Sequence, residues 1–265
     1  MFLTYVTKKD DIANNLTVVI LTKNEEKNIV DVIANAKQVT DKVLIVDSGS
    51  TDKTVELAEA NGAKVIYRQW DNDFAAQRNF ALEHVDTEWV LYLDADERMN
   101  GELVTNIKNE LQAPKNALYR FSRRNSAFGR EFQYGVLAPD SVLRMFPKDM
   151  AKWEGKVHEN PIGDLPVKVL KGCLKHYTYT DFSQYLSKMN SYAAIGAQNN
   201  KVKKKKVGVI KDFVFRPFFA FVKMYILKKG FMEGWIGFVL CLNYANYTLN
   251  KYILLKMIDE ENNNF

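Results

Sequence analysis

Short apolar segments that favour β-strands alternate with helical segments along the first hundred residues of this chain. The strand-like segments are 16–22, 43–46, 64–67 and 89–93. Apolar residues with helical spacing lie between them at 29–36, 55–58 and 74–84. Strand–helix–strand repeats of this length form right-handed βαβ units. We therefore predict an α/β fold, with a mostly parallel, Rossmann-like sheet flanked by helices.

Acidic side chains follow three of these segments at the point where each predicted strand ends. Glu25 comes after the first strand, Asp47 after the second, and Asp94 and Asp96 after the fourth. Ligands of open parallel sheets bind outside the carboxyl ends of the strands. Mg²⁺ and Mn²⁺ bind through one or two carboxylates together with substrate phosphates. The four residues Asp-Ala-Asp-Glu alone would equally fit a charged turn, but three acidic strand ends together predict a site for a cation and a diphosphate.

Glycine-rich phosphate-binding loops are absent from the sequence. It contains neither G-x-x-x-x-G-K-[ST] nor G-x-G-x-x-G, the two patterns that cradle phosphates with backbone N–H groups. We therefore expect the metal and a cation such as Arg78 to neutralise the diphosphate. The carboxylates can accept hydrogen bonds from ribose or sugar hydroxyls and from a base N–H.

The pattern changes after residue 110. Segments 117–121 and 141–146 alternate like half-exposed strands, 153–159 is expected to be a loop, and 167–174 a short strand. From residue 182 onward the chain is expected to be helical. We predict two parts, an α/β catalytic part at 1–181 and a basic, helical C-terminal appendage at 182–265.

The C-terminal part combines four lysines at 203–206 with an aromatic-rich run at 213–221. Neither this run nor 236–242 reaches the roughly 20 apolar residues that a membrane-spanning helix needs. A polybasic segment beside an apolar one is typical of a helix in a membrane interface. The alternative is that the aromatic residues pack on the α/β core and the lysines form a solvated face.

Charge and cysteine content limit the possible partners and compartment. The 265 residues have a net charge of +5, and basic residues accumulate after Arg120. This favours anionic partners, but a GXXG loop and a strand-borne aromatic pair for RNA are absent, so we expect anionic lipid and no nucleic acid. Cys173 and Cys241 lie far apart, which excludes a zinc pattern and suggests a reducing compartment. The first fifteen residues lack the apolar core of a secretory signal.

Four motifs resemble glycosyltransferase family 2 in their order and spacing. They are Leu-Thr-Lys-Asn-Glu at 21–25, Val-Asp-Ser-Gly-Ser-Thr-Asp at 46–52, Ala-Gln-Arg-Asn at 76–79 and Leu-Asp-Ala-Asp at 93–96. The resemblance implies the GT-A fold and a nucleotide-diphosphate sugar donor. Two later segments, 153–159 and 174–179, resemble a bacterial subgroup that includes glucosyltransferases extending the inner core of lipopolysaccharide.

The resemblance also implies roles for individual residues. Asp96 and His176 would hold Mg²⁺ or Mn²⁺, with His158 as the other histidine considered, although either histidine could be structural. Glu159 would be the base of an inverting displacement, with Asp140, also expected in a loop, as the competing carboxylate. Arg78 would face the diphosphate or donor sugar and Asp94 the ribose or metal. The other expected substrate-binding residues are Thr22, Asn24, Glu25, Asp47, Ser48 and Asp52, with Asp47 on the uracil or its ribose.

These expectations combine into one predicted function. The chain would be a metal-dependent hexosyltransferase that moves glucose from a UDP-sugar to a lipopolysaccharide-core or other glycolipid acceptor. It would work in the cytoplasm, at the inner face of a bacterial inner membrane, in an oligomeric state that the sequence leaves open. One alternative function is a nucleotidyltransferase, but such an enzyme has a basic, glycine-rich loop after the first strand, where this chain has Thr-Lys-Asn-Glu-Glu. The other alternative is a non-enzymatic membrane-surface protein, which would not need Asp94 and Asp96.

Overall fold

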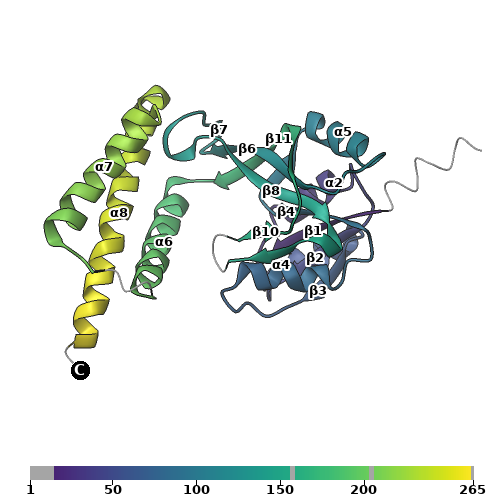
Figure 1. Ribbon diagram of the computed structural model, residues 1–265, viewed down its shortest axis with the longest axis horizontal. Coiled ribbons are helices and arrows are strands. Elements are labelled where there is room, and N and C mark those ends of the chain that lie inside the picture. The colour runs from purple at the N-terminus through teal and green to yellow at the C-terminus, as the bar shows by residue number, and fades with distance from the viewer. Residues whose placement is uncertain (1–14, 156–158, 203–205, 264–265) are drawn as a thin grey trace, which may run out of the picture. The chain divides into compact units, whose positions relative to one another are not determined.

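The computed structural model describes residues 15–155, 159–202 and 206–263 and divides the chain into two compact units (Figure 1). Unit 1 comprises Met1–Arg123 and Asp140–His176, and unit 2 comprises Arg124–Pro139 and Tyr177–Phe265. The chain crosses between the units three times, within β6 (Leu118–Ala127), between Pro139 and Asp140, and within β11 (Val167–Tyr179).

The parallel half of the main sheet is formed by the four segments that the alternation predicted. β1 (Leu16–Thr22) lies between β2 (Val43–Asp47) and β4 (Trp89–Asp94), and β3 (Lys64–Tyr67) pairs with β2. The connections contain α2 (Ile29–Ala36), α3 (Thr54–Ala60) and α4 (Phe74–Leu82). Because the strands are parallel, the polar residues after β1, β2 and β4 leave the sheet at the same edge.

The other half of the sheet is antiparallel. β8 (Asp140–Pro147) pairs with β4, β6 pairs with β8, and β11 connects β6 to β5 (Glu97–Met99), while the short β7 (Arg130–Glu131) extends β6. α5 (Gly101–Glu110) follows β5. The sheet is therefore mixed and flanked by helices, which confirms the predicted fold class and limits the parallel arrangement to β1–β4.

Two apolar clusters explain why the strands read as continuous apolar runs. Leu16, Val18 and Ile20 of β1 belong to one buried cluster, and Val19 belongs to the other. β4 alternates in the same way, with Leu91 in the first cluster and Tyr92 in the second. A strand that is covered on both faces has no position at which a polar residue would reach water.

Two local expectations were wrong, the first of them only in part. Residues 153–159 were expected to form a loop, but Trp153 and Glu154 belong to β9 (Lys152–Glu154), which pairs with β10 (Asn160–Ile162) in a small separate sheet, and residues 156–158 lie outside the described residues. Trp153 holds β9 in place, because its side chain is buried against Tyr92 and its backbone exchanges two hydrogen bonds of 2.8 Å with the Asn79 side chain. Asp140 was expected in a loop and is the first residue of β8, paired with Arg123 of β6. The strand predicted at 167–174 continues to Tyr179 as β11.

Unit 2 is helical apart from the ends of its strands, as predicted for the C-terminal part. α6 (Phe182–Val202) and α7 (Arg216–Val222) contact the long helix α8 (Gly234–Asn263). Wider helical turns flank α7 at Ile210–Phe215 and Lys223–Leu227, and single tight turns occupy Gly135–Leu137, Lys148–Met150 and Gly230–Glu233.

Close backbone contact fixes the start of α8. A Cβ atom on Gly237 would lie 2.0 Å from the carbonyl oxygen of Gly230, so this approach requires glycine. Among the described residues, none of the helices has the length and apolar content to cross a membrane. Of the lysines at 203–206, only Lys206 lies within the described residues, and it is exposed.

Candidate active site

Asp94, the last residue of β4, lies between two arginines at the carboxyl edge of the parallel strands. Its Oδ1 accepts a hydrogen bond of 2.8 Å from Nη2 of Arg78, and its Oδ2 accepts one from Nη2 of Arg144. Burial opposes ionisation of this carboxyl, but the two guanidinium groups outweigh it and hold the pKa of Asp94 well below its usual range. Asp94 is therefore a permanent anion at neutral pH.

Glu97 extends this contact into a network in the interior. Its side chain is fully buried, and its Oε1 accepts hydrogen bonds from Arg144 (2.8 Å) and Arg123 (3.3 Å). Its Oε2 accepts from the backbone N–H of Asp94 at 3.1 Å, which closes the turn after β4. Arg123 also forms a two-point ion pair with Asp140, at 2.9 and 2.7 Å. Burial opposes the charges of Arg144 and Arg123, yet their carboxylate partners raise the pKa of both.

Arg78 reaches this network from α4 and is almost fully buried. Its guanidinium carbon lies 4.7 Å from the ring centre of Trp153 and 5.5 Å from that of Tyr92. Its Nε donates to Oε1 of Glu159 at 3.2 Å. The buried Nη1 of Arg78 and Nε of Arg144 have no hydrogen-bond partner within the part of the chain that the structure describes. Two buried cationic donors thus have hydrogen-bonding capacity that the described residues do not use.

Two of the predicted metal ligands lie together next to this network. Nε2 of His176, on β11, is 3.4 Å from Oδ2 of Asp96, and the side chains are 17% and 26% exposed. β11 and β5 bring them together, since His176 is paired with Glu97 in the sheet. The described residues contain no group of three or more His, Cys, Asp or Glu side chains that could hold a metal. His158 lies outside the described residues.

The polar residues after β1 and β2 form a compact loop structure. The buried carboxylate of Asp47 accepts four hydrogen bonds, from the backbone N–H groups of Gly49 (2.9 Å) and Ser50 (2.8 Å) and from the hydroxyls of Thr22 (3.1 Å) and Ser50 (2.5 Å). Asp47 therefore shapes this loop in the structure. Its predicted contact with uracil or ribose remains a prediction and would require some of these bonds to be exchanged. Ser48 accepts a hydrogen bond of 3.2 Å from Gln77 of α4.

Similar contacts join the two loops to each other. Asn24 has a backbone φ of +56°, and its side-chain oxygen accepts from the backbone N–H of Thr51 at 2.8 Å. The backbone N–H of Glu25 donates to the hydroxyl of Thr54 at 2.7 Å, and Asp52 accepts from that hydroxyl at 2.5 Å. The small burial of Asp52 opposes ionisation, but its hydrogen bonds outweigh this and lower the pKa. The structure thus places the predicted nucleotide-binding residues together, at the edge where Asp94 also lies.

The sequence motifs assign no site role to Glu97, Arg123 or Arg144. For Glu97 a signal was present, because Glu97 and Met99 share one face of a strand and Met99 belongs to the apolar core. Arg123 follows Tyr119 and Phe121 at every second position of β6, and both of these apolar side chains belong to the core. A glutamate and an arginine that both occupy core-facing positions of their strands indicate an internal ion pair.

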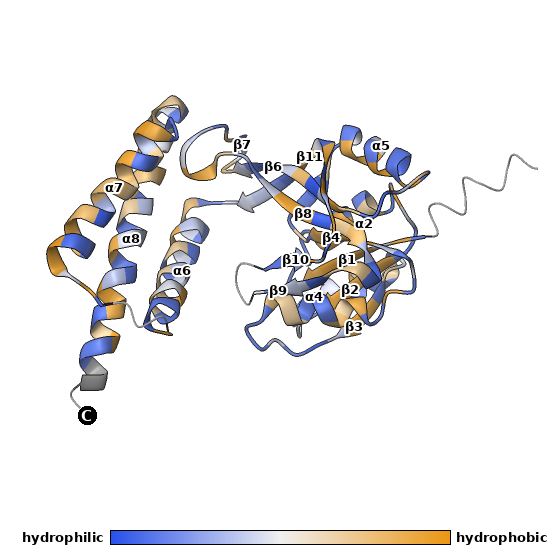
Figure 2. Cartoon of the chain, viewed as in Figure 1, coloured by the Kyte–Doolittle hydropathy of each residue, from blue (hydrophilic) through white to orange (hydrophobic). Residues whose placement is uncertain are grey.

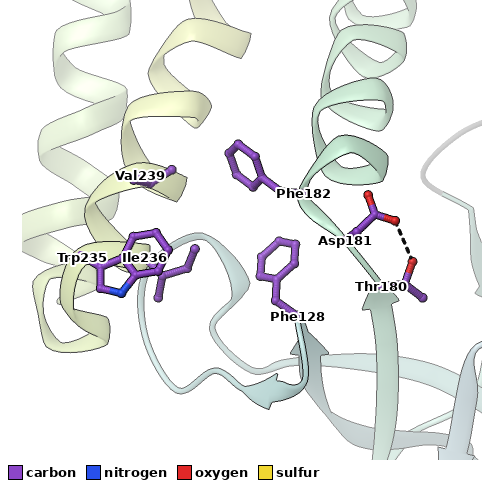
Figure 3. A pocket seen from close by; sticks show the side chains of 7 residues that line it. All are labelled: Phe128, Thr180, Asp181, Phe182, Trp235, Ile236 and Val239. Atoms are coloured by element: carbon purple, nitrogen blue, oxygen red, sulfur yellow. Dashed lines mark hydrogen bonds between the residues drawn. The ribbon is translucent and has the colours of Figure 1, made fainter.

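A separate apolar pocket lies within unit 2. It has a volume of about 480 Å³ and is lined by Phe128, Thr180, Asp181, Phe182, Trp235, Ile236 and Val239. Figure 3 shows the Phe128 and Phe182 rings beside each other, with ring centres 6.1 Å apart, and the Thr180–Asp181 hydrogen bond at the polar end. No residue proposed from the sequence lines this pocket.

Comparisons with known proteins assign the chain to a family. Residues 17–161, more than half of the chain, match the family described as glycosyl transferase family 2. An uncharacterized glycosyltransferase of Rickettsia typhi is 28% identical over 253 residues, which cover 87% of this chain and 82% of that protein. The lipopolysaccharide core biosynthesis glycosyltransferase LpsC of Rhizobium meliloti is 27% identical over 246 residues, 88% of each protein.

Among solved structures, the glucosyl-3-phosphoglycerate synthase of Mycobacterium tuberculosis in complex with Mn²⁺, UDP and phosphoglyceric acid covers 71% of this chain and 79% of its own. The two are 17% identical, with a TM-score of 0.46. Together, the family match over residues 17–161 and the glycosyltransferase relatives confirm what the four motifs predicted: the chain belongs to glycosyl transferase family 2 and is a glycosyltransferase.

Proposed function

We propose that this glycosyltransferase moves a hexose, glucose in the first instance, from a UDP-sugar to a lipopolysaccharide-core or other glycolipid acceptor, with inversion at the anomeric carbon. The observation that supports this most is the charge arrangement at the end of β4. Arg78 and Arg144, each with a buried donor nitrogen left over, meet there with Asp94, Asp96 and His176. Such a set suits a diphosphate that carries a divalent cation.

The residues present fit a divalent cation. Asp96 supplies a carboxylate and His176 an imidazole nitrogen, and Mg²⁺ or Mn²⁺ takes its remaining ligands from substrate phosphates and water. The absence of a third protein ligand among the described residues is therefore compatible with this site. When bound, the cation would neutralise charge on the departing diphosphate.

The arginines would share this task without leaving the interior. Arg78 is held in place from three directions, by Asp94, by Glu159 and by the Trp153 ring. A donor that is held by its neighbours needs no reorganisation when negative charge develops on the diphosphate oxygen. Asp94 compensates the two arginines while the site is empty of substrate, which keeps them buried and charged.

Glu159 would accept the proton of the acceptor hydroxyl. The hydroxyl oxygen would form the new bond to the anomeric carbon, while the bond from that carbon to the diphosphate oxygen breaks. Glu159 is mostly buried, and its Oε1 faces Arg78, so it lies beside the group that would hold the diphosphate. Asp140, the competing carboxylate, is engaged at both oxygens by Arg123. This favours Glu159 as the base.

We propose the acceptor and the cellular location from the relatives and from the surface of unit 2. A relative named for lipopolysaccharide core biosynthesis spans 88% of the chain. A lipid-linked core would be extended at the cytoplasmic face of the bacterial inner membrane, where nucleotide sugars are also found. We propose that the enzyme associates with that face as a peripheral protein.

A donor screen tests this proposal. The purified enzyme would be incubated with Mn²⁺, a lipooligosaccharide-core acceptor and one of UDP-glucose, UDP-galactose or GDP-mannose, and nucleotide release would be measured. We expect acceptor-dependent UDP release from a UDP-hexose. Glu159→Gln should lower turnover by about 10²-fold or more, because a positioned base contributes 10²–10⁴-fold.

Glu154→Gln is the matched control, since Glu154 is a half-exposed carboxylate on the neighbouring strand β9. It should turn over at the wild-type rate. Equal activity of the Glu159 variant would exclude Glu159 as the base, and release from GDP-mannose alone would exclude a UDP-sugar donor.

A further inference from the structure

The helical segment 210–227 of unit 2 is apolar on both of its sides. Its inner side packs on α8, where the rings of Phe221 and Tyr225 lie 5.8 and 5.7 Å from the ring of Phe238. Its outer side carries large apolar side chains that touch little of the protein, and Phe218, Phe219 and Leu227 are 60%, 62% and 72% exposed. Figure 2 shows hydrophobic residues along α7.

We call this outer side the aromatic face and define it by Val214, Phe215, Phe218, Phe219, Ile226 and Leu227, each more than half exposed. They lie along 210–227, where wider helical turns flank α7, so they do not follow a single α-helical spacing. A helix that faces water carries polar residues on its exposed side, and exposed apolar surface of this kind marks an interaction site.

The exposed charges on segment 210–229, which carries the aromatic face, are of one sign. Between residues 206 and 258 the acidic residues are Asp212 and Glu233. Both are buried, Asp212 paired with Arg216 and Glu233 with Arg130. Their negative charges are therefore neutralised inside the unit. The exposed charges that border the face are basic, at Lys211, Lys223, Lys228 and Lys229.

This charge pattern identifies the partner. A second copy docking through a two-fold axis would bring the same four lysines against each other, which is unfavourable. An anionic bilayer would place acyl chains against the phenylalanines and headgroup phosphates against the lysines. Basic residues flanking aromatic ones on a helix are the features of a helix that lies in a membrane interface.

Trp235, at the start of α8, adds a further amphipathic side chain in the same unit. Its side chain is 77% exposed and forms one wall of the apolar pocket of Figure 3. Tryptophan is enriched at membrane–water interfaces, where its ring lies at headgroup level. Phe231 and Met232, two exposed residues in the turn before α8, lie close to it in sequence.

We propose that the aromatic face, with its four bordering lysines and Trp235, is the surface through which this enzyme binds an anionic phospholipid bilayer. The inference deepens the proposed function, on which it rests for the identity of the membrane. It places the contact on 210–235, which includes the aromatic-rich run at 213–221 that the sequence combined with the lysines at 203–206; the first three of those lysines lie outside the described residues.

Binding to vesicles tests the proposal directly. The full chain would be sedimented with vesicles of phosphatidylglycerol and phosphatidylcholine or of phosphatidylcholine alone, at 50 and 500 mM NaCl. We expect binding to the anionic vesicles that weakens with salt, and a blue shift of tryptophan emission that Trp235→Phe removes. Trp89 and Trp153 are buried and Trp70 lies in unit 1, so none of these three should respond.

Two variants separate the apolar and the charged contributions. Phe218→Ser with Phe219→Ser should weaken vesicle binding by about tenfold or more, because each phenylalanine would lose its apolar contact. Lys211→Gln, Lys223→Gln and Lys228→Gln together should weaken it by about fivefold for each lysine. The matched control Lys42→Gln, Lys64→Gln, Lys108→Gln removes three exposed charges from unit 1 and should change nothing.

The outcomes distinguish this inference from the proposed function. Vesicle binding that is absent, or unchanged in both test variants, would overturn the membrane surface, whereas UDP binding by the same samples would still report on the active site. A dimer in solution that Phe218→Ser with Phe219→Ser dissociates, without vesicle binding, would assign the face to a second copy and overturn the proposal.

Discussion

Replacing Arg144 by methionine removes the cation that joins two carboxylates inside unit 1. Arg144 is 5% exposed, and one of its nitrogens contacts both Asp94 and Glu97. Methionine keeps most of the side-chain volume, so the change is chiefly electrostatic. Because Glu97 is fully buried and its remaining cationic partner would be Arg123, at 3.3 Å, we expect the folded state to lose about 3–5 kcal/mol. This corresponds to a fall of roughly 10 °C in melting temperature.

The loss of unfolding free energy should also depend on pH, and its direction follows from the lowered pKa of Asp94. Its pKa in the folded state lies below the value of about 3.9 in the unfolded chain. The carboxylate therefore stabilises the wild type fully above about pH 4–5, and this contribution fades as the pH falls further. The difference in unfolding free energy between Arg144→Met and wild type should thus be full at pH 7 and should shrink at pH 3.5.

Urea unfolding followed by circular dichroism measures both quantities. Arg120→Met is the control, because Arg120 makes one contact of 3.3 Å to Ser141 at the surface, and it should change stability by no more than about 0.5 kcal/mol. A loss below about 1 kcal/mol for Arg144→Met at pH 7, or a loss that grows on acidification, would refute this account of the network.

Two further predictions concern the framework of the site. Gly172→Ala should destabilise unit 1 by about 2 kcal/mol or more, since the φ of Gly172 is +96° and the new Cβ would lie 2.4 Å from the backbone nitrogen of Leu103. The control Gly101→Ala has open space around the new Cβ and should be near neutral. Equal melting temperatures of the two variants would contradict this packing. Tyr92→Phe should cost about 1 kcal/mol in urea unfolding by removing the hydroxyl that donates to the Arg78 carbonyl at 2.8 Å. Burial raises the Tyr92 pKa further than Arg78 lowers it, so this loss should be the same at pH 7 and pH 9, and a change between them would contradict the assignment. Tyr67→Phe, at a mostly exposed tyrosine, is its control.

The sequence was most informative where one physical rule decided the outcome. The strands at 16–22 and 89–94 could be predicted because both of their faces are buried, which requires an uninterrupted apolar run. The convergence of Asp47, Asp94 and Asp96 at one edge followed from the parallel order of the strands. The pairing of Asp96 with His176 came only from resemblance, since the two residues are far apart in the chain and no local pattern links β5 to β11.

Other features depend on contacts that a local pattern does not encode. Arg144 is the extra residue of a β-bulge, because the pairing steps from Tyr119–Met145 to Arg120–Leu143. A bulge breaks the alternation of faces and redirects one side chain, so the strand pattern could not reveal that Arg144 reaches Asp94. Asp47 is similar: it was expected to accept hydrogen bonds from the uracil or its ribose, whereas in the structure Thr22, Gly49 and Ser50 donate four hydrogen bonds to its carboxylate.

The most direct test of the central claim is isothermal titration of UDP into the wild type and Asp96→Asn, each with and without Mn²⁺. Asp86→Asn, at an exposed residue beyond α4, serves as the matched control. If Asp96 and His176 hold the cation and the diphosphate lies against Arg78 and Arg144, the wild type and the control should bind UDP at least tenfold more tightly with Mn²⁺. Asp96→Asn should lose that increase while keeping its fold. UDP binding that is indifferent to Mn²⁺ and to Asp96 would contradict the assignment of the nucleotide and cation site to the end of β4.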